Sequence, residues 1–171
     1  EAMNNATSDP NILSAAVDAY RRLSKGISVS TAIEAMTGFK IIPLNLDTPQ
    51  DSALLDHIGQ AADHCAIKSV ANPIVSARVN EVGNLIEPRL KISLEAHGFD
   101  VSWPCAADGT GGRSGYPDLL ITQDQGRLTY IEVKAVGHGQ EGSSFRSFYL
   151  SPSEKPKIVA DARHLLVGFG Y

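Results

Sequence analysis

The most informative stretch of the chain is residues 117–135, which read PDLLITQDQGRLTYIEVKA. Two largely apolar runs, at 118–122 and 127–135, flank the short segment QDQG. Apolar runs on both sides of a short turn that contains glycine are typical of a β-hairpin. We therefore expect two neighbouring antiparallel strands here.

Charged side chains gather on one face of this predicted hairpin. Because side chains alternate along a strand, Glu132 and Lys134 share one face of the second strand. If the turn comprises residues 124–126, Asp118 lies directly opposite Glu132, with Cβ atoms about 5 Å apart. Two such carboxylates repel each other unless a cation lies between them, and ligands that are all oxygen suit Mg²⁺ or Mn²⁺. A lysine beside them can help to deprotonate an attacking water, which predicts metal-assisted hydrolysis of a phosphodiester.

Before residue 72 the apolar residues recur at helical spacing. Three helices are predicted there: residues 10–25, a short helix that begins with a capping box at Thr31 and Glu34 and ends at Gly38, and residues 50–68. The short helix lacks the basic and amide side chains that read base edges. Packing on a core is therefore a better interpretation of it than a helix-turn-helix.

After Asn72-Pro73 the pattern becomes mixed. The predicted elements are a helix over 74–97, strands over 99–104, 117–122, 127–135 and 145–150, a helix over 152–163 and a strand over 164–169. Pro88 lies inside the first of these helices, so either that helix kinks or a new helix starts near Ile86. The glycine-rich residues 108–115 do not match a phosphate-binding loop, because no GK[ST] follows and the next element is a strand.

The step from Tyr116-Pro117-Asp118 to Glu132-Val133-Lys134 resembles the PD-(D/E)xK nuclease superfamily, which includes type II restriction endonucleases, Holliday-junction resolvases and repair nucleases. The resemblance covers about residues 74–169, where the predicted order of elements is similar to the αβββαβ core of that superfamily. It implies an α/β fold of the restriction-endonuclease-like type, with a mixed central sheet flanked by helices. Residues 71–171 are then the nuclease-like core, and residues 1–70 are a helical N-terminal region for target recognition or dimerisation.

The resemblance also implies roles for particular residues. Asp118 and Glu132 are expected to be metal ligands, and Lys134 is expected to position the nucleophile, with Mg²⁺ as cofactor and Mn²⁺ as its substitute. The superfamily places a further carboxylate on the helix before the sheet. The sequence after Glu87 is similar to the resolvase pattern, so Glu87 is expected to be this catalytic and metal-binding carboxylate, and Glu81 is the alternative.

Contact with DNA is expected to be local and to involve a few basic side chains. The formal net charge of the chain is -4, opposite to that of proteins that coat nucleic acid through bulk positive charge. Duplex DNA is the expected partner, bound by a homodimer, because one active site cuts one strand at a time. The candidates for phosphate contacts are Arg113, Arg146, Lys155 and Lys157, with the pair Arg163-His164.

Composition excludes several other classes of protein. The 171 residues are 43% apolar and 20% charged, which fits one globular domain or a core with a helical extension. No run of 18 apolar residues and no signal-peptide pattern occurs, so a soluble cytoplasmic protein without a membrane span is expected. The two cysteines, Cys65 and Cys105, form no CxxC pair, and free thiols are expected.

The function predicted from these observations is that of a Mg²⁺-dependent DNA endonuclease similar to type II restriction endonucleases. The extra N-terminal region and the long loop before Pro117 favour this interpretation over the first alternative, a structure-specific repair or recombination nuclease. The second alternative is a catalytically idle nucleic-acid-binding module. Three charges held together on one sheet face argue against it.

Overall fold

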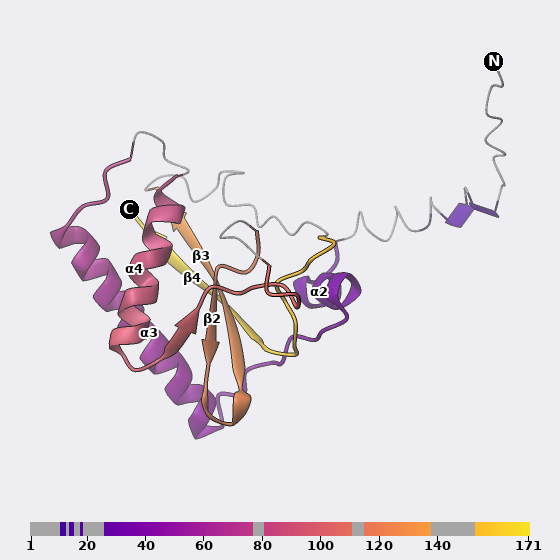
Figure 1. Ribbon diagram of the computed structural model, residues 1–171, viewed down its shortest axis with the longest axis horizontal. Coiled ribbons are helices and arrows are strands. Elements are labelled where there is room, and N and C mark those ends of the chain that lie inside the picture. Colours follow the sequence, from indigo (N-terminus) through magenta and orange to yellow (C-terminus); the bar gives the residue numbers. More distant parts are fainter. Residues whose placement is uncertain are drawn as a thin grey trace, which may run out of the picture.

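The computed structural model describes residues 11–12, 14–15, 18, 26–76, 81–110, 115–137 and 153–171. Most of the helix predicted over 10–25, and the whole strand predicted over 145–150, fall outside these residues. The described residues form an α/β structure, in which a four-stranded sheet has helices on both of its faces (Figure 1).

The four strands lie in the order β1-β2-β3-β4. They are β1 (Asp100–Ser102), β2 (Leu119–Thr122), β3 (Leu128–Val136) and β4 (Arg163–Gly170). The first three strands are antiparallel and β4 pairs with β3 in parallel, so the sheet is mixed, as predicted. The predicted hairpin of β2 and β3 is confirmed. Its turn is the 3-10 segment η2 (Asp124–Gly126), in which Gln125 and Gly126 adopt positive φ angles of 62° and 72°.

The sheet separates two apolar clusters. Helices α3 (Pro49–Ala71) and α4 (Val82–Ala96) cover one face, and α2 (Val29–Thr37) lies on the other (Figure 1). Ile131 and Val133 of β3 face α3 and α4, whereas Tyr130 packs with Ile33 of α2, which confirms the predicted alternation of β3. None of the helices in the described part of the chain is long and apolar enough to cross a membrane.

Helix α3 belongs to the predicted N-terminal region, yet it shares a core with the sheet. Leu54, Ile58 and Cys65 are buried in the same cluster as strand residues of β2 and β3. The function of that region in recognition or dimerisation stays a prediction. Cys65 and Cys105 are both free thiols.

The short helix α2 begins earlier than predicted. Ser28 is its N-cap, and the Oγ atom of Ser28 accepts a hydrogen bond from the Thr31 N–H at 3.1 Å. The capping box predicted at Thr31 is therefore wrong, because a hydroxyl three residues earlier already satisfies that end of the helix. Gly38 ends the helix as predicted, with a φ of 78°.

Helix α4 is shorter than the predicted helix over 74–97. It begins at Val82, and residues 73–76 are not helical. Pro88 lies within α4 and cannot donate to the carbonyl four residues earlier. The helix nevertheless continues through Pro88 without a second start, which leaves Glu87 in its interior.

The helix predicted over 152–163 is wrong for residues 153–161, which form no helix. Pro156 removes one helical donor from this segment. Other backbone donors pair with distant parts of the chain: the Val159 N–H donates to the Tyr130 hydroxyl, and the Ala162 N–H donates to the Lys40 carbonyl. Tertiary hydrogen bonds therefore replace the local ones that a helix needs.

A buried ion pair joins the hairpin to the N-terminus of α3. Asp51 lies in the first turn of α3 and is 2% exposed. Its carboxylate lies 2.5 Å from Nη2 of Arg127, beside the hairpin turn, and 2.9 Å from Nη2 of Arg163, at the start of β4. A hydrogen bond from the Asn45 N–H, then the hydrogen bond and charge of Arg163 and the hydrogen bond of Arg127, hold the pKa of Asp51 below its usual range.

We expect Asp51→Asn to lower the midpoint of thermal unfolding by several degrees at neutral pH, because both guanidinium groups lose their counter-charge. The pKa of Asp51 is lower in the folded chain than its ordinary value of 3.8. The stabilisation is therefore present above that value and is lost as pH falls through the folded pKa. When thermal unfolding is followed at a series of pH values, the unfolding midpoints of the wild type and the variant should converge in acid. Asp56→Asn, at an exposed site on the same helix, is the matched control, and an equal loss in that variant would contradict the ion-pair account.

Candidate active site

The predicted carboxylate pair forms where β2 begins beside β3. The Asp118 N–H donates to the Ile131 carbonyl at 3.0 Å, and Oδ2 of Asp118 accepts from the Val133 N–H at 2.7 Å. Since Val133 directly follows Glu132, these two hydrogen bonds hold the Asp118 carboxylate beside Glu132. The β2–β3 register pairs Leu119 with Ile131, which places Asp118 opposite Glu132.

Glu132 is a buried carboxylate in which only one oxygen accepts a hydrogen bond from the described residues. It is 7% exposed, and its Oε1 accepts a hydrogen bond from Nζ of Lys134 at 2.5 Å. Its Oε2 is buried and has no hydrogen-bond partner among the described residues. Burial, and then the charge of Asp118, raise the pKa of Glu132, while Lys134 opposes them. An oxygen in this state is one that a cation would stabilise.

A second lysine, from an irregular segment before β4, lies near the same carboxylates. Lys157 is 8% exposed, and its Nζ donates to the Pro117 carbonyl at 2.5 Å, directly before Asp118. Burial lowers the pKa of Lys157, and the charges of Asp118, Glu132 and Glu87 oppose that shift. Three carboxylates from separate parts of the fold thus attract the ammonium group of Lys157 electrostatically.

Of the two helix glutamates, Glu87 is the one near this site. It is 6% exposed in α4 and acts electrostatically on Lys157. Glu81 precedes α4 and accepts a hydrogen bond from the Ser76 hydroxyl at 2.9 Å. The structure therefore favours Glu87 as the helix carboxylate, and its catalytic role stays a prediction.

Tyr116 and His164 form a hydrogen-bonded pair next to the carboxylates. The Tyr116 hydroxyl and Nδ1 of His164 are 2.5 Å apart, and the two rings stack with centroids 5.7 Å apart. Burial lowers the pKa of His164 to about 4, so the imidazole is neutral at neutral pH. Burial, and then the charges of Glu132 and Asp118, raise the pKa of Tyr116. Sequence reasoning missed this pair, whose members are 48 positions apart.

Asp118 and Glu132 fit the needs of a hard divalent cation. Among the described residues no three His, Cys, Asp or Glu side chains converge as a metal cluster. Mg²⁺ is usually held by one or two carboxylates together with substrate phosphates and water, rather than by a complete protein cage. The pair, with the unpartnered Oε2 atom of Glu132, meets that requirement.

The basic residues predicted to contact phosphates lie in different settings. Arg113 and Arg146 lie outside the described residues. Lys155 is exposed and lies 2.8 Å from Asp108, which lowers the pKa of that carboxyl to about 2. Arg163 is engaged by the buried ion pair at the start of α3. The phosphate contacts predicted for Arg113, Arg146, Lys155 and the buried Lys157 stay predictions.

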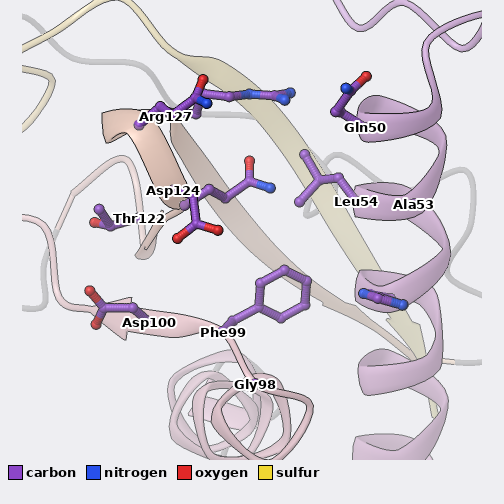
Figure 2. Close-up of a pocket in the computed structure, with 12 residues that line it drawn as sticks. Gln50, Ala53, Leu54, Gly98, Phe99, Asp100, Thr122, Asp124 and Arg127 are labelled. Atoms are coloured by element: carbon purple, nitrogen blue, oxygen red, sulfur yellow. The ribbon is translucent and has the colours of Figure 1, made fainter.

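A pocket of about 640 Å³ lies at the opposite end of the hairpin, between its turn and α3 (Figure 2). Phe99 and Leu54 supply apolar wall, and Asp100, Asp124 and Arg127 supply charge. The pocket borders Thr122 at the end of β2, whereas Asp118 precedes the start of that strand. None of the predicted catalytic residues lines the pocket. The candidate active site is therefore separate from this pocket.

Comparison with known proteins identifies a family and a relative of this chain. A family model described as the type II restriction enzyme MjaV family matches residues 23–171. The type II restriction enzyme MjaV of Methanocaldococcus jannaschii is 35% identical in an alignment of 158 positions that covers 84% of this chain and 68% of that protein. No solved structure matches the chain significantly.

We expect His164→Gln to flatten the dependence of stability on pH between pH 6.5 and about 4. In the folded chain the imidazole stays neutral down to about 4, whereas the unfolded chain takes up a proton below 6.5. Wild-type stability should therefore fall as pH falls through this window, and the glutamine variant lacks that contribution. Urea unfolding at several pH values measures the slope. His57→Gln, at an exposed position, should keep the wild-type slope, and a flattened slope there would count against the assignment to His164.

Proposed function

The chain belongs to the type II restriction enzyme MjaV family, and from this premise we propose that it is a Mg²⁺-dependent endonuclease that hydrolyses phosphodiester bonds of duplex DNA. The observation that carries the proposal is the half-buried Asp118 beside the buried Glu132, with Lys134 bonded to Glu132. A buried carboxylate oxygen without a donor is costly in a protein that has no cation to bind there. The relative from Methanocaldococcus jannaschii carries the name of a restriction enzyme, which supports the same class of reaction.

In this proposal each residue of the motif has a separate task. Asp118 and Glu132 hold Mg²⁺, with Mn²⁺ as a substitute, and Glu87 is the accessory carboxylate on α4. The bound ion neutralises charge on the phosphate and raises the acidity of water. Lys134 orients the attacking water and helps to remove its proton, and its hydrogen bond to Glu132 fixes the ammonium group for that task.

The proposed fold is the restriction-endonuclease-like core of the PD-(D/E)xK superfamily. The succession of α4, β1, β2, β3 and a final strand parallel to β3 supports it. The second helix of the αβββαβ order does not occur over residues 153–161. We further propose that the chain acts as a homodimer on duplex DNA and that residues 1–70 contribute to recognition or to the dimer interface.

The decisive experiment is cleavage of plasmid DNA with Mg²⁺ or Mn²⁺ by the wild type, Asp118→Ala and Lys134→Ala. We expect discrete fragments from the wild type. Lys134→Ala should be slower by about 10²–10⁴-fold, the range for loss of a positioned acid or base. Asp118→Ala should be at least as impaired, because it removes a metal ligand. Gel analysis of the fragments over time measures both rates.

Two controls separate the possible functions. Lys40→Ala, which removes an exposed lysine far from the carboxylates in sequence, should cut like the wild type. A branched synthetic duplex tested in parallel identifies a structure-specific nuclease if it is cut in preference to the plasmid. Absence of metal-dependent cutting of either substrate would contradict the proposal and favour a catalytically idle module.

A further inference from the structure

Lys157 is held in the carboxylate site by contacts of the two residues that follow it in the chain. The next residue, Ile158, is buried in the cluster that contains Tyr130. The Val159 N–H donates to the Tyr130 hydroxyl at 3.1 Å, which ties the segment to β3 two residues before Glu132. The position of Lys157 therefore follows from tertiary packing of an irregular segment against the sheet.

The surroundings of Lys157 are negative. One buried ammonium requires compensation in a medium of low polarity. The Pro117 carbonyl supplies one acceptor, and the charges that act most on Lys157 are those of Asp118, Glu132 and Glu87. Lys134 lies with the same group, so two ammonium groups face three carboxylates.

We propose that Lys157 is the internal counter-cation of this site: its ammonium group offsets the mutual repulsion of Asp118, Glu132 and Glu87 in the metal-free protein and opposes the entry of a divalent cation. The metal-binding half of this inference rests on the proposed function. The counter-charge half concerns the metal-free chain alone.

The geometry favours a role through charge rather than through the hydrogen bond to Pro117. Asp118 is already held by two hydrogen bonds with β3, one through its N–H and one through Oδ2. These contacts do not involve Lys157. Loss of the contact to the Pro117 carbonyl therefore leaves Asp118 beside Glu132, whereas loss of the ammonium leaves the carboxylates to repel one another.

This role has opposite consequences for the metal-free and the metal-bound protein. Without the ammonium of Lys157, the clustered carboxylates destabilise the metal-free fold. A divalent cation then meets less positive charge at the site and binds more tightly. A lysine that served only as a structural hydrogen-bond donor would lower stability and leave metal affinity unchanged or weaker.

The test compares Lys157→Met, Glu132→Gln and the double variant by thermal unfolding in EDTA. Lys157→Met should lower the unfolding midpoint in the wild-type background and lower it much less when Glu132 is already neutral, because the repulsion is then smaller. An equal loss in both backgrounds overturns the counter-charge role. If Lys157→Met alone does not fold, cooperative unfolding recovered in the double variant supports the inference, and failure of both variants to fold overturns it.

The second measurement is a Mn²⁺ titration followed by the shift of the unfolding midpoint, without DNA. The Mn²⁺ concentration at half-effect should fall by about tenfold in Lys157→Met, as expected when one positive charge near the ion is removed. Lys40→Met, which removes an exposed lysine that pairs with Glu34, should bind Mn²⁺ like the wild type. An unchanged or higher half-effect concentration in Lys157→Met overturns the proposed effect on metal binding.

These readouts separate the inference from the proposed function. Metal-dependent cleavage by the wild type, with no coupling between Lys157 and Glu132, overturns this inference and leaves the nuclease function intact. Strong coupling in EDTA, with no Mn²⁺ shift in the wild type, supports the counter-charge role and overturns the metal site on which the proposed function depends.

Discussion

The hydrogen bond from the Val133 N–H to the Asp118 carboxylate is the contact on which the site depends. It uses the backbone of β3 to hold a side chain that precedes β2. Any slip of one residue in the β2–β3 register would move Glu132 to the opposite face of the sheet. The three-residue turn, with Gln125 and Gly126 in the left-handed region, sets that register at the far end of the hairpin.

Buried charge holds the hairpin at both ends. At the turn, Arg127 is bound by Asp51 of α3, which also binds Arg163 of β4. At the other end, Lys157 binds the Pro117 carbonyl and faces the carboxylates. The first group places one carboxylate between two guanidinium groups and links three elements of the fold. The second contains more carboxylates than lysines, which is the imbalance expected of a site that takes up a cation.

Errors in the predicted secondary structure have a common cause. The segment over 153–162 has residues that suit a helix after Ser153, but two of its backbone N–H groups donate to the Tyr130 hydroxyl and the Lys40 carbonyl instead. Helix α4 begins at Val82, although apolar residues before it continue the helical spacing. In each case local spacing describes what a segment prefers alone, and the packed chain decides which conformation it adopts.

The sequence by itself determined the hairpin, the two faces of β3 and the juxtaposition of Asp118, Glu132 and Lys134. Strand alternation and a short turn are local rules, so residues 14 positions apart can be placed without the rest of the chain. Only the tertiary structure placed Lys157 against Pro117, paired Tyr116 with His164 and distinguished Glu87 from Glu81. These contacts depend on how separate elements pack against one another. Spacing along the chain predicts neighbours within a helix or hairpin, but it does not predict which distant side chains packing brings together.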